Sequence, residues 1–240
     1  MHLESGHVAP DGDQPRSRAD EAYLTLRERI VNCRLAPGQR VTERQLAAEL
    51  DLGLTPIRQA LVRLDSEGLV RTLPRRGYQV TPLTIQSVNE LFQIWRILGP
   101  AIAELTVKTA SVDEREQVQR MYAEKIGRAR AENDHSALVE LADSMWVRLA
   151  EATGNRRLAE MYTRLSGELC RVFRLLFQDS AALDALFGAH GDLFFSFLNA
   201  DPEESRANAE RFITVAHRHA LGILMEWPSV AQAEVVFPVA

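Results

Sequence analysis

The chain of 240 residues contains only two cysteines, which limits how covalent bonds can hold it together. Cys33 and Cys170 are too few for a disulfide framework, so we expect both to be reduced and packed in the interior. No stretch approaches the roughly 20 consecutive apolar residues of a membrane helix. Residues 1–15 lack the basic-then-apolar pattern of a secretion signal and are expected to be disordered. These absences favour a cytoplasmic protein that does not enter a membrane.

Catalytic signatures are absent as well. The sequence has no Gly-x-Ser-x-Gly nucleophile elbow, no His-Glu-x-x-His metal pair and no Gly-rich phosphate loop. Its hydrophobic content of 46% and charged content of 25% are ordinary for a globular protein, and its length allows two domains with separate cores. The sequence therefore argues against an enzyme.

Charge is distributed unevenly along the chain, whose formal net charge is −5. Residues 16–82 contain 12 arginines and 8 acidic residues, which gives +4. Residues 1–15 carry −3, and residues 83–240 carry −6. A positive segment inside an acidic protein is the electrostatic pattern expected of a nucleic-acid-binding domain.

The positive segment contains a helix-turn-helix pattern. Residues 42–50 are predicted to form a short helix with Thr42 as its N-cap. Gly53 permits a sharp turn, and Thr55 with Pro56 is expected to start a second helix that ends at Gly68. Residues three or four positions apart give this second helix one buried face: Ile57, Leu61 and Leu64.

Two short strands are predicted after the second helix. They cover residues 70–73 and 78–80 and are joined by a basic turn, Pro74-Arg75-Arg76-Gly77. A further helix is expected before the motif, over residues 20–35. This order is that of a winged helix-turn-helix, whose second helix enters the DNA major groove while the wing follows phosphate or the minor groove.

The segment from Ala36 to Val80 resembles the N-terminal domain of the GntR superfamily of bacterial transcription regulators. The resemblance rests on residues 36–41 together with the helix-turn-helix and wing. It implies DNA contacts from six residues: Arg44, Thr55, Pro56, Arg58, Arg76 and Gly77. The family usually has Ser and Arg just before the Thr-Pro pair, where this chain has Gly53 and Leu54. Operator sequences of better-known members therefore cannot be transferred to it.

The second half of the chain is predicted to be entirely helical. The first helix covers residues 84–109 with a kink at Gly99-Pro100. Five more are expected at 113–131, 136–152, from the break at Gly154 to Phe177, at 180–199 and at 202–227, where Pro228 ends the last one. We therefore divide the chain into a tail (1–15), a DNA-binding domain (16–82), a helical domain (83–228) and a C-terminal tail (229–240).

These helices resemble the FCD effector domain of the FadR subfamily, in its six-helix VanR-like branch. The matching stretches are residues 92–98, 149–155 and 190–201. The resemblance implies a mainly α protein, with a winged helix-turn-helix followed by an antiparallel six-helix bundle. It also implies a homodimeric repressor on a near-palindromic double-stranded operator, whose affinity responds to a small molecule such as an organic acid.

Many family members hold a divalent metal in the bundle. Their ligands are an Asp, a His one turn later on the same helix, and a His from each of the last two helices. The corresponding positions here are Asp143, Val147, His190 and Phe212. Valine and phenylalanine offer no lone pair, so we expect no tightly bound metal and predict no other cofactor.

The bundle interior is nevertheless the expected effector site, lined by Arg96, Asp143, Trp146, Val147, His190 and Phe212. One alternative is a filled pocket in which Asp143 is hydrogen-bonded to His190. The other is a cavity for an organic effector, with Arg96 binding a carboxylate.

Two functions follow from the sequence. The first is a ligand-responsive, homodimeric transcription factor that acts as a repressor. The second is a metabolite-binding protein or an enzyme in which Asp143 and His190 form an acid–base pair. The sequence does not identify the effector or the operator.

Overall fold

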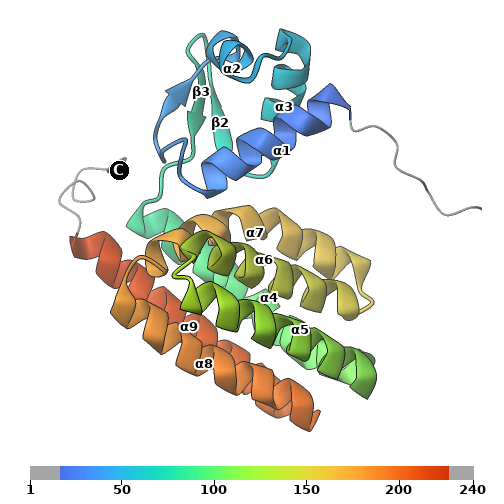
Figure 1. The fold of residues 1–240 in the computed structure, drawn as a ribbon. Helices are drawn as coiled ribbons and strands as arrows, with labels where there is room; N and C mark the ends of the chain where they lie inside the picture. The colour runs from blue at the N-terminus through green and yellow to red at the C-terminus, as the bar shows by residue number, and fades with distance from the viewer. Residues whose placement is uncertain (1–16, 227–240) are drawn as a thin grey trace, which may run out of the picture.

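The computed structural model describes residues 17–226, apart from the side chains of residues 194–195 and 197–199. The expected tails at 1–15 and 229–240, and the helix end at Pro228, lie outside the described residues. Figure 1 shows a small α/β part stacked against one side of a larger helical bundle. The mainly α architecture expected from the sequence is confirmed.

The small part contains three helices and a three-stranded antiparallel sheet. In chain order its elements are α1 (Arg18–Val31), β1 (Arg40–Val41), α2 (Glu43–Leu50), α3 (Leu54–Ser66), β2 (Val70–Leu73) and β3 (Gly77–Val80). The strand order is β1-β3-β2, so β3 is the central strand. Tyr78 of β3 pairs with Val41 of β1 on one side and with Thr72 of β2 on the other. The sequence did not predict β1, because two residues are too short to produce an alternating pattern.

The turn between α2 and α3 differs in detail from the prediction. The oxygen of Thr42 caps α2 as expected, accepting from the backbone N–H of Gln45 at 3.2 Å. The left-handed residue is Asp51, with φ of 52°, whereas Gly53 is extended with φ of −69°. Gly53 is itself the N-cap of α3, so Thr55 and Pro56 occupy the second and third helical positions rather than the first.

The core of this part lies between α1, α3 and the sheet. The predicted inner faces of α2 and α3 are buried at Leu46, Ile57, Leu61 and Leu64. They pack with Leu26 and Ile30 from α1. Gly68 adopts φ of 73° just after α3, as a helix-ending glycine does. Helix α3 is thus buried along one face and exposed along the other.

The helical bundle follows with six helices in the described residues. They are α4 (Ile85–Thr109), α5 (Val112–Ala131), α6 (His135–Ala152), α7 (Arg156–Leu176), α8 (Ser180–Asn199) and α9 (Pro202–Glu226). Helix α4 continues through Gly99-Pro100, with Pro100 inside it, and the predicted kink there stays a prediction. Gly99 instead permits close packing: a Cβ there would lie 2.5 Å from Cδ1 of Ile213 on α9.

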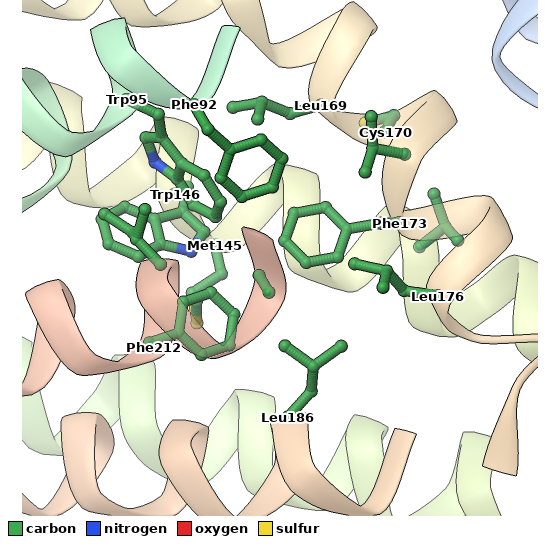
Figure 2. Close-up of a cluster of buried hydrophobic side chains, with 14 of the residues drawn as sticks. Phe92, Trp95, Met145, Trp146, Leu169, Cys170, Phe173, Leu176, Leu186 and Phe212 are labelled. Atoms are coloured by element: carbon green, nitrogen blue, oxygen red, sulfur yellow. The ribbon is translucent and has the colours of Figure 1, made fainter. Parts of the chain in front are cut away.

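Aromatic side chains fill the centre of the bundle (Figure 2). Trp95 packs edge-on against Trp146, Phe173 and Phe212, with ring centroids 5.5, 5.7 and 5.9 Å away. Such edge contacts are a favourable geometry for aromatic pairs. The centre is therefore occupied by the protein's own side chains.

Helix α1 packs on α7 and joins the two parts (Figure 1). Arg27 of α1 donates to the hydroxyl of Ser166 on α7 at 3.3 Å. Arg171, also on α7, is fully buried and donates to the carbonyl of Thr81 in the linker after β3. Among the described helices, none is long and apolar enough to cross a membrane.

Candidate nucleic-acid interface and effector domain

The exposed face of α3 carries Arg58, whose guanidinium is held by a neighbouring carboxylate. Its Nη2 lies 2.7 Å from Oε2 of Glu43, and its Nε lies 3.0 Å from Oε1. The hydroxyl of Tyr78 donates to the same Glu43 carboxylate at 3.4 Å. These contacts lower the pKa of Glu43, with the hydrogen bond from Arg58 as the main cause. Side chains from α2, α3 and β3 thus fix one arginine on the surface.

This arrangement leaves Arg58 available to a ligand. Its side chain is 63% exposed, and Nη1 takes no part in the contacts with Glu43. A guanidinium held in place loses less conformational entropy when it binds a planar acceptor pair such as a guanine edge. The sequence did not anticipate the part played by Glu43 and Tyr78, because the contact joins residues 15 and 35 positions apart.

The wing presents a second basic element. Arg76 is exposed, and its side chain has no hydrogen-bond or ion-pair partner within residues 17–226. The turn depends on Gly77, which has φ of 86° and whose Cβ, if present, would lie 2.6 Å from the carbonyl oxygen of Val41. Gly77 therefore shapes the wing through its backbone.

The other predicted DNA contacts lie on the same elements. Arg44 is exposed in the first turn of α2, Thr55 is exposed in the first turn of α3, and Pro56 is half-buried beside it. In Figure 1, α2 and the β2–β3 turn lie at the end of the domain that points away from the bundle. Contact of these six residues with DNA stays a prediction.

Arg63 has a different role from its neighbours on α3. Its Nη1 lies 2.7 Å from Oδ1 of Asp20, and its guanidinium stacks 3.7 Å from the ring centroid of Tyr23. Both partners are on α1. These contacts tie α3 to α1.

The predicted effector residues do not meet at one place. Trp146 and Phe212 are buried in the aromatic centre shown in Figure 2. His190 lies beside Phe212, with its Nε2 3.2 Å from the sulfur of Met145. The cavity that His190 and Phe212 line holds about 30 Å³, which is too small for a metabolite. The bundle centre therefore matches the filled alternative.

Asp143 faces away from His190, so the hydrogen bond between them that the filled alternative included is not formed. Oδ2 of Asp143 lies 3.9 Å from Nη2 of Arg27, and Asp143 lines a separate cavity of about 240 Å³ between α1, α6 and α7. Asp143 and Met145 are two residues apart, so on a helix they point to nearly opposite sides. The interior positions one turn apart on α6 are Ala142 and Trp146, one residue before the expected pair.

The remaining two residues lie elsewhere. Val147 is half-buried at the edge of the bundle core. Arg96 is exposed on α4, with its Nη2 3.1 Å from Nδ1 of His217. Burial lowers the pKa of His190 to about 4, so its imidazole is neutral at pH 7.

The residues present do not fit the metal site that the family implies. Asp143 and His190 line separate cavities, and Ala142 and Trp146 offer no ligand. Within the part of the chain that the structure describes, no three His, Cys, Asp or Glu side chains gather closely enough to hold an ion. The expected absence of a metal stays a prediction.

Comparison with protein families accounts for both parts of the chain. Residues 18–80 match the model of the gntR family of bacterial regulatory proteins, and residues 90–214 match the FCD domain. The chain is a GntR-family transcriptional regulator with an FCD domain. The resemblance inferred from the sequence is thereby confirmed.

Known relatives of this GntR-family regulator include proteins from several bacteria. It is 25% identical over 162 residues to the HTH-type transcriptional regulator YdhC of Bacillus subtilis. This alignment covers 67% of this chain and 72% of YdhC. It is 23% identical over 182 residues to the HTH-type transcriptional repressor RspR of Escherichia coli K12, covering 75% and 79%. The structure also superposes on that of E. coli McbR/YncC, with a TM-score of 0.74 and 19% sequence identity. The superposition covers 88% of this chain and 99% of the McbR/YncC chain, and it supports the fold.

Membership of the GntR family decides between the two functions considered from the sequence. The matched families and relatives are transcriptional regulators, which are not enzymes. The proposed acid–base pair also has no geometric basis, since Asp143 and His190 lie on different sides of α6. The functional regions of the regulator are thus the DNA-binding surface of its helix-turn-helix and its FCD domain, which implies an effector ligand.

Proposed function

We propose that this GntR-family regulator is a cytoplasmic repressor that binds a near-palindromic double-stranded operator as a homodimer. A small metabolite bound in the FCD domain changes its operator affinity. The observation that carries the proposal is Arg58, held by Glu43 on the exposed face of α3 beside an arginine-bearing wing. Repression is supported by two relatives named as repressors, RspR and the gluconate operon repressor of Bacillus licheniformis.

Each predicted DNA contact has a separate role in the proposal. Arg58 reads a guanine in the major groove, because a guanidinium pairs with O6 and N7 in a bidentate way. Arg44, Thr55 and Arg76 contact phosphates, which position the domain without reading sequence. Pro56 and Gly77 shape the backbone where α3 and the wing approach DNA. Of these six, the three arginines supply the dependence on salt.

The proposed dimerisation is supported by the small area of DNA that one winged helix can contact. A single winged helix buries little DNA surface, whereas two domains related by a twofold axis bind two half-sites together. The helical domain is the proposed dimer contact. Apolar side chains on α4 and α9 remain exposed there, with Ile94 at 43%, Ile97 at 68% and Met225 at 67%. Exposed apolar residues of this size favour a covering partner.

Fluorescence anisotropy with DNA from upstream of the regulator's own gene tests the function. We expect binding whose affinity falls steeply as salt rises, because bound arginines displace counterions from phosphate. A fragment of the same length from inside the coding sequence serves as the control and should bind more weakly. Failure to bind any genomic fragment, even at low salt, would refute a DNA-binding role.

Light scattering tests the dimer separately. With a chain mass of 26.9 kDa, a dimer scatters as a particle of about twice that mass. A mass of one chain at micromolar concentration, together with binding of one chain to one half-site, would contradict the dimer while leaving DNA binding intact.

A further inference from the structure

A cleft lies at the end of the bundle where α4 ends, α5 begins and α6 ends. It has a volume of about 440 Å³, in contrast to about 30 Å³ beside His190 in the centre. Small-molecule sites commonly measure about 300–1,000 Å³. None of the six residues predicted to bind an effector lines it. Its wall consists of Thr106, Thr109, Ala110, Glu114, Arg115, Val118, Gln119, Arg148, Leu149, Glu151 and Ala152.

The apolar part of the wall comes from all three helices. Val118 of α5 lines it together with Leu149 and Ala152 of α6, and Ala110 lines it just after α4. The hydroxyl of Thr106 is already used, since it donates to the carbonyl oxygens of Ile102 and Leu149, both at 2.8 Å. This part of the cleft suits the hydrocarbon body of a ligand.

Two guanidinium groups supply the polar part. Nη1 of Arg115 donates to the carbonyl oxygens of Val107 and Ala110 at the end of α4, at 3.2 and 2.7 Å. Its Nε is buried and has no acceptor among the described residues. Arg148 is exposed, and its side chain has no ion-pair or hydrogen-bond partner within residues 17–226. Nη2 of Arg115, which takes part in neither of these bonds, and the guanidinium of Arg148 therefore retain donors for an acceptor supplied by a ligand.

The acidic side chains of the wall limit the ligand's charge. Glu114 is engaged, because its Oε2 accepts from both the backbone N–H and the hydroxyl of Ser111 at 2.8 Å. These bonds lower the pKa of Glu114, led by the one from the backbone. Glu151 lies on the rim one turn from Arg148, and its charge would repel a second anionic group on a ligand.

We propose that this cleft binds a small organic monocarboxylate with an apolar body. The carboxylate contacts Arg148 and Arg115, and the body packs against Val118 and Leu149. The site rests on the proposed function, for which it supplies the location and chemical class of the effector. Helix α6 carries the cleft at its C-terminal end and, two turns earlier, Asp143 beside Arg27 of α1. A ligand in the cleft therefore touches a helix that also contacts the DNA-binding part.

Isothermal titration of the full chain with benzoate and hexanoate tests the site without DNA. Benzamide, which has the shape of benzoate without its charge, is the matched probe. We expect at least one carboxylate to bind at millimolar concentration or below, and benzamide to bind at least about tenfold more weakly than benzoate if benzoate binds. If neither carboxylate binds, or if benzamide binds as well as benzoate, the proposal is overturned.

Variants locate the binding within the chain. Arg148→Gln should weaken binding of the carboxylate at least about tenfold, because it removes the exposed cation. Ala152→Phe should also weaken it, by filling the cleft without changing charge. The matched control is Arg156→Gln, whose side chain is 89% exposed on α7 outside the cleft and should not affect binding. If both Arg148→Gln and Ala152→Phe bind the carboxylate as tightly as the unmodified protein does, the ligand lies elsewhere and the proposal is overturned.

The anisotropy assay separates the two proposals. If operator DNA binds normally while the carboxylates fail to bind, the cleft inference is wrong and the regulator function stands. If the carboxylates bind in the cleft while no genomic DNA binds, the cleft is a ligand site and the proposed repressor function is wrong.

Discussion

At the scale of single residues, Arg58 carries the clearest expectation about DNA. Arg58→Ala should weaken operator binding by about 1–3 kcal/mol and relax specificity at one base position, because a bidentate contact to guanine is lost. Anisotropy with operator variants measures both effects. Arg120→Ala, which removes an exposed arginine from α5 in the bundle, is the control and should bind as the unmodified protein does. Unchanged operator affinity in Arg58→Ala would reject α3 as the reading helix.

His190 provides a second residue-scale prediction, concerning pH. Burial lowers its pKa from 6.5 to about 4, so the unfolded chain binds the proton more readily between these values. Stability should therefore be full above about pH 6.5 and fall as pH drops towards 4, by about 2 kcal/mol between pH 7 and pH 5 from this group. Urea unfolding of the protein and of His190→Gln at both pH values measures it. If the variant loses as much stability as the unmodified protein, His190 does not make this contribution.

The role of a single residue could be predicted from the sequence only where its partner lies close to it along the chain. Thr42 was correctly assigned as an N-cap because its partner, Gln45, is three residues away. The fixing of Arg58 by Glu43 could not be foreseen, since it requires α2 and α3 to be placed in space first. A local pattern identifies a residue type, whereas a tertiary contact decides its role.

At the scale of elements, most helices were predictable because their starts carry side-chain caps. Ser111 and Asp134 cap α5 and α6 within two residues of the predicted starts, and Asp179 caps α8 at the predicted start. The rotation of α6 was not predicted. Its register was placed one residue late, which put Asp143 and Val147 inside where Ala142 and Trp146 lie. One residue is a turn of about 100° on a helix, enough to exchange an interior position for one at the domain junction.

The wing gives an element-scale prediction through Gly77. Gly77→Ala should destabilise the protein by about 1–3 kcal/mol, because φ of 86° is strained for alanine and its Cβ would lie 2.6 Å from the carbonyl oxygen of Val41. Thermal or urea unfolding measures the change. The control is Gly127→Ala in α5, where a Cβ meets nothing described within 4 Å and alanine should stabilise by up to about 1 kcal/mol. Equal stability of the two variants would mean that the wing tolerates a side chain at Gly77.

At the scale of the whole molecule, the junction between the two parts could not be predicted from the sequence. Arg171 lies in a helix of apolar periodicity, yet its buried guanidinium contacts the linker carbonyl of Thr81. Burial lowers its pKa to about 10, so it is charged at pH 7. A buried charge with few partners is costly, and its loss of hydration must be offset by the contacts that hold the linker. The orientation of the DNA-binding part is therefore built into α7.

A close approach across this junction, at Gly167, supplies the last prediction. A Cβ at Gly167 of α7 would lie 3.1 Å from Cδ1 of Leu69, which is buried in the DNA-binding part. Gly167→Val should therefore wedge the two parts apart while leaving α3 and the wing intact. In the proposed dimer, two recognition helices must match the spacing of two half-sites. We expect the affinity for a full operator to fall by roughly tenfold or more, since linked binding depends on geometry, while the affinity for a single half-site stays unchanged.

Parallel anisotropy titrations with full operator and half-site DNA measure this difference, and circular dichroism checks that the variant remains helical. Gly188→Val in α8 is the matched control, because a Cβ at Gly188 meets no described atom within 4 Å and α8 lies on the far side of the bundle (Figure 1). It should lower neither affinity. An equal loss on both DNAs in Gly167→Val would mean that the DNA-binding surface itself was disturbed. No loss on either would mean that the spacing of the recognition helices is set by some contact other than the packing of Leu69 on α7.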